Sequence, residues 1–522
     1  MLGNQTRAQL GPGGTLLLYL GFAALMWAVR GWVLAGTFRN VLLIVAALAV
    51  LGITSRILGD WRNGVYFFLA WLLFEDLIRK YMGNAMFVYF AKDALVAVVY
   101  ASFLKATSRG KVAAFRPPFL FPLGLFFALG LAQMFNSGSP SILYGILGMK
   151  LYFYYVPLMF VGYALLRDEK DLHRFLVANV ALAAPIALLG IAQSVFGLDF
   201  MNPHAGADLE LLGHLTRYTQ SGVAVSRPPS VFVSDGRFDE YLVLAAILGI
   251  GAAGYLLLRT KRGRKIVFPA LALLGLAAML SGSRGSAVWV GASALFLSAG
   301  MLWGAPPRAA ETYRLVKAIR RTFIVIALSL SLGTVLFPQA IGARWQFYAE
   351  TLDPRSEYYE VSYRAWDYPV NNFLLAFTDR DWVVGHGIGT QSLGVQYVAK
   401  LVGQDVDDSI GRFNLENGWA TLIWELGVLG PILWVLWSVS FVYAAWKATM
   451  RVKGTPLFPV ALSIFWYAFL LLLPLSFEGL SGYQNFVINA YFWVLAGILF
   501  RLPKLVGGPV GQFAVNSPQP ST

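Results

Sequence analysis

Long apolar runs separated by short polar ones dominate the pattern along the chain. Many of these runs hold about 18 to 25 residues, enough to cross a hydrocarbon core of about 30 Å as a helix. A helix satisfies its own backbone hydrogen bonds and is the natural spanning element. The pattern predicts an all-α fold, a polytopic transmembrane helical bundle of about 12 to 14 spans. The candidate spans are residues 15–34, 38–56, 63–79, 84–104, 119–136, 142–166, 174–196, 239–258, 264–281, 286–304, 321–338, 418–445, 457–474 and 484–501.

Basic residues between the spans predict the orientation of the bundle. The basic clusters are KATSRGK at 105–111, RTKRGRK at 259–265, KAIRR at 317–321 and KATMRVK at 447–453. When the spans alternate in direction, all of these clusters fall on one side, and loops rich in Lys and Arg are typical of the cytoplasm. We therefore expect a multi-pass protein with both termini in the cytoplasm.

Composition narrows the class of protein. Hydrophobic residues make up 57% of the chain and charged residues only 13%, which is typical of an integral membrane protein. The formal charge of +14 is compatible with nucleic-acid binding, but in so apolar a chain it indicates basic cytoplasmic loops instead. We expect no nucleic-acid partner. The absence of cysteine excludes disulfides and thiolate metal sites.

The spans and the longer connections divide the chain into four parts. Residues 1–338 hold the predicted transmembrane helices 1 to 11 and a smaller outer loop at 197–238. A large outer loop at 339–417, the C-terminal transmembrane helices at 418–504 and a cytoplasmic tail at 505–522 follow. The first apolar segment lacks a small-residue cleavage site, so we interpret it as a retained helix. Because long ordered loops tend to carry function, the two outer loops are the places to look for a site.

Arg284 stands between two apolar spans in SGSRGSAVWVGASAL. An arginine at the end of a membrane helix is commonly an anchor at the interface. Small residues and exposed amides around it, such as Ser281, Gly282 and Ser283, instead suit a phosphate oxygen. Arg227, stiffened by the two prolines that follow it, is a second candidate ligand, although its mixed-charge neighbourhood also fits a solvated rim.

Ionisable residues inside predicted spans need partners or a polar cavity. Lys92 and Asp93 are adjacent, so they point in different directions around a helix and need not pair with each other. Lys150 lies in GMKLYFYYVPL, where it is a candidate for holding an anionic headgroup. Partners within the membrane and a basic cavity open to the outside are both compatible with these residues. In the second case Lys92, like Lys150 and His386, is a candidate for binding the substrate.

The large outer loop ends in RFNLENGWATLIWELGVLGPILW. Glu416 and Asn417 stand where the chain re-enters the membrane as a helix, and a polar residue there is often only a cap. A carboxyl group at such an interface is also a candidate general base, because its surroundings tune its proton affinity. His386 in VVGHGIGT is a weaker candidate base, since its flanking glycines indicate a turn.

Taken together, these motifs resemble those of the bacterial O-antigen ligase and polymerase superfamily. The motifs are the SGSRG span boundary, the arginine of YRAWDYPVNNFLLAF, the GHGIGT turn and ENGWATLIWELGVLGPILW, and the likeness covers roughly residues 84–500. The resemblance implies a GT-C-like glycosyltransferase of the bacterial inner membrane that acts on the periplasmic face. Its donor would be an undecaprenyl-diphosphate-linked glycan and its acceptor a glycan or lipid-linked glycan, with inversion and without a metal or other cofactor. Membrane lipids and other polysaccharide-assembly proteins are the remaining partners it implies.

The resemblance also implies roles for individual residues. Arg284 and Arg364 match the arginines that bind the diphosphate, with Arg227 and Arg344 as further candidates. Glu416 and Asn417 fall where ligases carry a histidine-asparagine pair, whose histidine is the proposed base. The glutamate favours polymerase members over ligases and would itself be the base.

The sequence is compatible with three hypotheses about the function. The first is a polymerase of lipid-linked repeat units for exopolysaccharide or O-antigen. The second is a ligase to lipid A-core or another acceptor. The third is a flippase or transporter that uses Lys92, Asp93 and Lys150 as a path.

Overall fold

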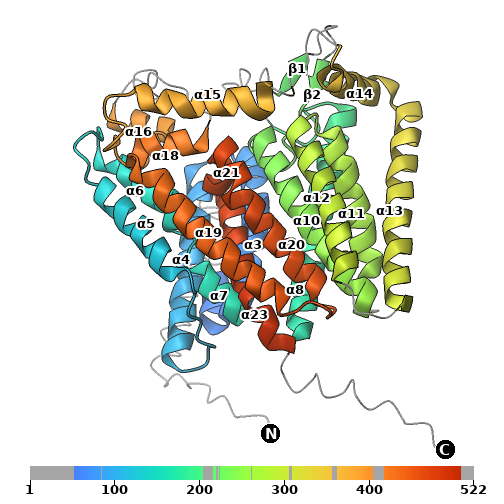
Figure 1. Ribbon diagram of the computed structural model, residues 1–522, viewed down its shortest axis with the longest axis horizontal. Coiled ribbons are helices and arrows are strands. Elements are labelled where there is room, and N and C mark those ends of the chain that lie inside the picture. Colours follow the sequence, from blue (N-terminus) through green and yellow to red (C-terminus); the bar gives the residue numbers. More distant parts are fainter. Residues whose placement is uncertain are drawn as a thin grey trace, which may run out of the picture. The chain divides into compact units, whose positions relative to one another are not determined.

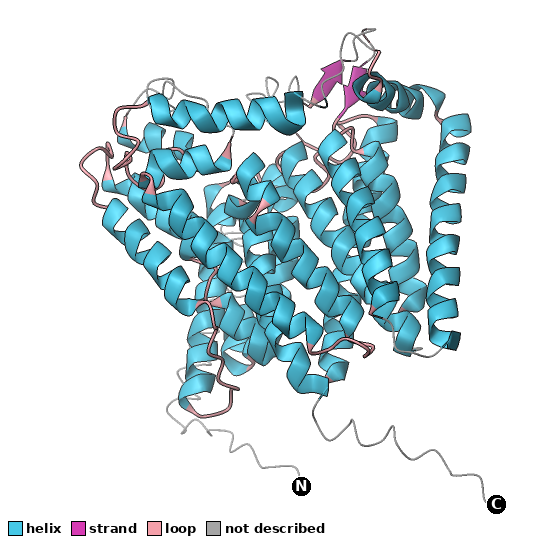
Figure 2. Cartoon of the chain, viewed as in Figure 1, coloured by secondary structure: helices cyan, strands magenta, loops and turns pink. Residues whose placement is uncertain are grey.

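The computed structural model describes residues 52–83, 85–203, 215–218, 222, 224–259, 262–304, 309–355, 361, 363–403 and 417–506. The predicted span 15–34, most of the span 38–56, and the predicted base Glu416 lie outside the described residues. Within the described part, helices account for nearly all regular structure, and a small antiparallel hairpin pairs β1 (Thr216–Tyr218) with β2 (Ala224–Ser226) (Figure 2). The prediction of an all-α polytopic fold is confirmed at this level.

The helices follow the predicted spans closely along most of the chain. They are α3 (Trp61–Tyr81), α4 (Met86–Ser108), α5 (Leu120–Gln133), α6 (Ile142–Phe153), α7 (Leu158–Leu165), α8 (Glu169–Phe196), α10 (Asp235–Arg259), α11 (Arg264–Leu280), α12 (Arg284–Trp303), α13 (Ala309–Leu336), α14 (Pro338–Leu352), α15 (Tyr368–Leu375), α16 (Val395–Val402), α18 (Gly418–Leu426), α19 (Leu429–Met450), α20 (Phe458–Leu472), α21 (Pro474–Glu478), α22 (Ser481–Gln484) and α23 (Phe486–Val506), with a π-helix η2 (Tyr363–Asp367) and a 3₁₀ turn η3 (Ala376–Thr378).

Nine helical segments of the described residues are long and apolar enough to cross a membrane. They come from α4, α6 with α7, α8, α10, α12, α13, α19, α20 with α21, and α23. The described chain is thus that of a multi-pass membrane protein.

The chain divides into two compact units. The first unit contains Met1–Tyr66 and Ala94–Leu104, and the second contains Phe67–Asp93 and Lys105–Thr522. In the first unit, the Ser102 hydroxyl donates to the Ile57 carbonyl at 2.8 Å. All sites described below lie within the second unit.

Two predicted spans are broken in the structure. Span 142–166 is two helices, because the chain turns at residues 154–157 between α6 and α7. Span 418–445 is broken after α18 at Gly427, whose φ is +70° and whose hypothetical Cβ would lie 2.2 Å from the Val383 carbonyl oxygen. A glycine is needed there because a side chain has neither the room nor the preferred backbone conformation.

The core of the second unit is closed by α23, which is buried along most of its length. It crosses α7 at a pair of glycines that brings the two backbones together. A Cβ on Gly162 would lie 2.2 Å from the Val494 oxygen, and one on Gly497 would lie 2.1 Å from the Met159 oxygen. Small residues allow this close approach, as is common where membrane helices pack.

The segments predicted as outer loops gather at one end of the second unit. The β1–β2 hairpin, α14, α15 and α16 lie there, above the ends of the long helices in the view of Figure 1. Within the large predicted loop, the motif YRAWDYPVNNFLLAF supplies η2 and α15. At the other end of α12, the Gly454 amide donates to the Gly304 carbonyl at 3.1 Å and places the basic loop after α19 beside α12.

Candidate functional site

A cavity of about 650 Å³ lies among these segments of the second unit. Its wall comes from the start of α10, the α11–α12 turn, residues 391–396, α18 and the segment from α20 to α23. Its polar lining includes the carboxylates of Asp239, Glu240 and Glu478, the amides of Gln391, Gln396 and Gln484, and the indole of Trp289. No Lys, Arg or His is among the described residues that line it.

The SGSRG turn forms part of this wall. Ser283 caps α12, its hydroxyl accepting from the Ser286 amide at 3.4 Å, and both serines line the cavity. Gly282 has a φ of +70°, and a Cβ there would lie 3.0 Å from the Ser226 carbonyl. The turn is therefore fixed by a cap and by a close approach to β2.

Arg284 is the first residue of α12 and lies against α14. Its Nη1 donates to the Thr351 hydroxyl at 2.9 Å, and its guanidinium lies 4.6 Å from the centroid of the Phe347 ring. Its neighbours Ser283 and Gly285 line the cavity, whereas Arg284 itself is not among the lining residues. The structure thus places the arginine next to the cavity rather than in its wall.

Arg344 is buried and ties three segments together. Its Nε donates to the Leu280 carbonyl at 2.6 Å and its Nη2 to the Ser226 carbonyl at 2.8 Å. Burial away from water lowers the pKa of Arg344 to about 10. The guanidinium joins α14 to the end of α11 and to β2, which is a structural role compatible with its fork of donors.

Arg227 pairs with acidic residues at the start of α10. Its Nη1 lies 3.0 Å from Asp235 and its Nη2 lies 3.2 Å from Asp239. The side chain of Arg364, in η2, lies outside the described residues, as Glu416 does. The structure therefore brings Arg227, Arg284 and Arg344 to one end of the second unit, each on different partners.

Asn417 caps α18. Its side-chain oxygen accepts from the Ala420 amide at 2.9 Å and its Nδ2 donates to the Pro369 carbonyl at 3.0 Å. Both halves of the buried amide are used, so the capping role that the sequence allowed is the one observed.

His386 belongs to a turn held against α18. Its Nε2 lies 2.8 Å from an Asp379 oxygen, its ring lies 4.1 Å from that of Trp424, and its amide donates to the Trp424 carbonyl at 2.7 Å. The turn passes so close to α6 that a Cβ on Gly389 would lie 1.9 Å from the Tyr144 oxygen. The glycines of this turn are required by shape, as the sequence indicated.

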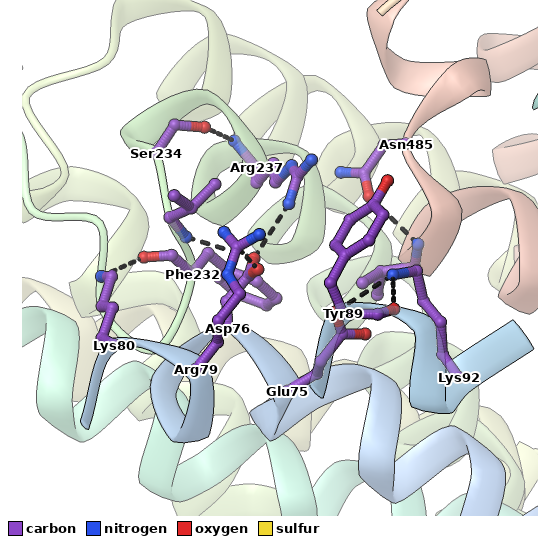
Figure 3. Close-up of polar contacts among 12 residues, drawn as sticks. Glu75, Asp76, Arg79, Lys80, Tyr89, Lys92, Phe232, Ser234, Arg237 and Asn485 are labelled. Carbon is purple, nitrogen blue, oxygen red and sulfur yellow. Dashed lines mark hydrogen bonds and ion pairs between the residues drawn. The ribbon is translucent and has the colours of Figure 1, made fainter. Parts of the chain in front are cut away.

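Lys92 and Asp93 point to different partners, as predicted. Lys92 Nζ lies 3.0 Å from Glu75 Oε1 and 3.2 Å from the centroid of the Tyr89 ring (Figure 3). Asp93 instead pairs with Lys150 at 2.6 Å. Both predicted lysine ligands thus have a carboxylate partner within the second unit.

A second group of ion pairs lies beside Lys92. Asp76 lies 2.9 Å from Arg237 Nη1 and 3.3 Å from Arg79 Nη2. Figure 3 shows these pairs converging from α3, α4 and the start of α10. We call Glu75, Asp76, Arg79, Lys92 and Arg237 the α3–α4 charge cluster.

A buried carboxylate in α18, Glu425, is not among the site residues predicted from the sequence. Glu425 is fully buried and accepts from the Ser392 hydroxyl at 2.7 Å, the Gln391 amide at 3.0 Å and the Tyr152 hydroxyl at 3.0 Å. Burial raises the pKa of Glu425 above its ordinary value. The signal in the sequence was a lone glutamate inside the apolar run LIWELGVLG.

The described residues contain no group of three or more His, Cys, Asp or Glu side chains that could hold a metal ion. No protein-family model, no curated protein and no solved structure matches the chain. The motifs and the geometry of the second unit are therefore the basis for any function.

Proposed function

We propose that this chain is a membrane glycosyltransferase that polymerises lipid-diphosphate-linked oligosaccharide units, with undecaprenyl diphosphate as the carrier. The observation that carries the proposal is the cavity of about 650 Å³ at the meeting point of the SGSRG turn, the segment after the GHGIGT turn, and α18. Motifs separated by more than a hundred residues in the sequence supply its walls. The proposed site faces the periplasm of the bacterial inner membrane.

The lining of the cavity suits a sugar. Carboxylates and amides accept and donate hydrogen bonds to hydroxyl groups, and an indole offers a flat apolar face to a pyranose ring. Trp289 and Gln391 lie on different segments of the wall, and Glu240 lies on a third. We assign the cavity to the acceptor glycan.

The proposed reaction is a single displacement with inversion. An acceptor hydroxyl attacks the anomeric carbon of the lipid-linked donor, the bond from that carbon to the diphosphate oxygen breaks, and Glu416 takes the hydroxyl proton. Arg284 and Arg364 bind the departing diphosphate. Fixed cations contribute most where charge develops in the transition state, so these arginines would raise the rate of transfer.

A flippase is less well supported by the charged residues within the bundle. Its path would run past Lys92, Asp93 and Lys150, but Lys92 pairs with Glu75, and Lys150 pairs with Asp93. A charged side chain that already has a close partner of opposite charge is less available to bind a substrate that moves past it.

The test is transfer by the purified protein, measured as a ladder of products from a lipid-linked oligosaccharide. We expect Arg284→Ala and Arg364→Ala to lower the rate by roughly 10²- to 10³-fold, as removal of one transition-state donor does. We expect Glu416→Gln to abolish laddering. The matched control is Arg167→Ala, since Arg167 is exposed and pairs with Asp171 at the start of α8.

Each alternative gives a different product. Full laddering by both Arg364→Ala and Glu416→Gln, at normal protein levels, would overturn the catalytic assignment. Movement of the lipid-linked glycan without a new glycosidic bond would identify a flippase. Transfer to lipid A-core without extension of the glycan would identify a ligase.

A further inference from the structure

We propose that Glu425 is a positioning residue whose buried carboxylate holds the cavity wall formed by residues 391–396 and so sets the affinity for the acceptor sugar. We call this segment the 391–396 wall. The link to the acceptor rests on the proposed function, whereas the link between Glu425 and the wall rests on geometry alone.

The hydrogen bonds around Glu425 fix which group donates and which accepts in each pair. Gln484 Nε2 donates to Tyr152 Oη at 3.1 Å and to Ser392 Oγ at 3.1 Å. Because each hydroxyl accepts from Gln484, it uses its own proton to donate to Glu425. The Tyr152 oxygen lies 3.0 Å and the Ser392 oxygen 2.7 Å from the carboxylate. The Gln391 backbone amide donates a third hydrogen bond to Glu425 at 3.0 Å.

These hydrogen bonds favour the ionised form of Glu425. The carboxylate accepts three hydrogen bonds, and each of the three donors carries its own hydrogen. A protonated carboxyl group would have to displace one of these donors. Hydrogen bonds to a charged acceptor are the stronger kind, so these three oppose the cost of burying the carboxylate.

The 391–396 wall depends on this network for its position. Its first backbone amides are held by side chains, Gln391 by Glu425 and Leu393 by Gln484 Oε1 at 2.8 Å. Gly394 follows with a φ of +92°. The helix α16 begins at the next residue, Val395. The carboxylate therefore substitutes for the regular hydrogen bonds that a loop lacks.

Glu425 acts on the cavity through its partners. Gln391, Ser392 and Gln484 line the cavity, whereas Glu425 does not. A change at Glu425 should thus move the groups that contact the acceptor and leave the reacting atoms alone. The expected signature is a higher KM for the acceptor with a nearly constant kcat.

The experiment compares Glu425→Gln with Glu169→Gln in the full-length protein. Glu169 is a matched control, because it also accepts from a tyrosine hydroxyl, that of Tyr255 at 2.9 Å, but its partners Tyr255 and Arg259 do not line the cavity. The first readout is amide hydrogen exchange of residues 387–396. We expect exchange there to become about tenfold faster in Glu425→Gln, equivalent to about 1.4 kcal/mol, and to stay unchanged in Glu169→Gln.

The second readout is steady-state transfer. We expect the KM for the acceptor glycan to rise about tenfold in Glu425→Gln while kcat stays within about twofold. The double variant Glu425→Gln/Gln484→Glu returns a carboxylate to the same two hydroxyls, so it should recover part of the protection and of the KM. If Glu425→Gln fails to fold, Tyr152→Phe removes one donor only and should give a smaller change in the same direction.

The two proposals fail separately. Unchanged exchange of residues 387–396 and an unchanged KM in Glu425→Gln would overturn the role of Glu425, even if the wild-type protein transfers sugar. A wild-type protein that forms no glycosidic bond, but whose 387–396 segment loses protection in Glu425→Gln, would overturn the proposed function and leave Glu425 as the residue that holds the wall.

Discussion

Two regions of the second unit solve the problem of a buried charge in opposite ways. In the α3–α4 charge cluster, carboxylates meet cations directly, as Glu75 does with Lys92 at 3.0 Å and Asp76 with Arg237 at 2.9 Å. Around Glu425, a carboxylate is surrounded by neutral donors. Ion pairs join helices rigidly, whereas neutral donors carried by a loop attach that loop to a helix.

This difference between the two regions predicts unequal losses of stability when one partner is removed. A buried ion pair that loses one partner leaves a bare charge, while a carboxylate that loses one neutral donor keeps the others. Each substitution below removes one contact of a different kind. The expected effects run from several kcal/mol to about one.

Lys92→Met should have the largest effect. It leaves Glu75 buried without its cation, which we expect to lower the free energy of unfolding by about 3–5 kcal/mol. Thermal unfolding in detergent measures the loss. The double variant Lys92→Met/Glu75→Gln removes both charges and should recover most of the stability; an equal loss in the single and double variants would contradict the ion-pair assignment.

Arg344→Lys tests a buried cation held by neutral acceptors. The lysine keeps the charge but cannot reach the Leu280 and Ser226 carbonyls as a fork, so we expect a loss of about 2 kcal/mol. Limited proteolysis of α14 and thermal unfolding check this. Arg355→Lys, at an exposed position, is the control and should stay within about 0.5 kcal/mol of the wild type.

Tyr152→Phe removes one of the three donors to Glu425. We expect a loss of about 1.5 kcal/mol, since two donors remain on the carboxylate. Chemical denaturation measures it. A loss as large as that of Lys92→Met would mean that Glu425 depends on Tyr152 as an ion depends on its counter-ion, and the distinction between the two regions would disappear.

Asn417→Ala should have the smallest effect, about 1 kcal/mol for the loss of a helix cap. Asn417→Asp retains a capping oxygen and should keep most of the stability. Transfer activity of the two variants separates capping from catalysis. If Asn417→Asp is stable and inactive, the amide has a chemical role beyond its cap.

The elements that depend on local pattern were predictable. Spans such as α8 and α10 follow from apolar length, the divergence of Lys92 and Asp93 follows from helix geometry, and the cap at Asn417 follows from its position before an apolar run. Each of these signals lies within a few residues of the structure that it predicts.

The elements that depend on distant partners were not predictable. Glu425 takes its donors from residues 33 and 273 positions away, so no local spacing marks the network. Arg344 has the chemistry of an anion ligand, but two backbone carbonyls from other segments use its donors. The break between α6 and α7 also lay inside a continuous apolar run, where length alone predicts a single helix.

The close crossing of α7 and α23 has a consequence for biosynthesis. These helices are also joined near their ends, where Arg501 donates to the Leu166 carbonyl, 335 residues earlier in the chain. A ribosome therefore releases α7 into the bilayer long before its partner exists, and the intervening helices must insert while the glycine face of α7 still meets lipid. The contact between α7 and α23 forms only when α23 arrives, so a chain that stops before residue 486 lacks this part of the core.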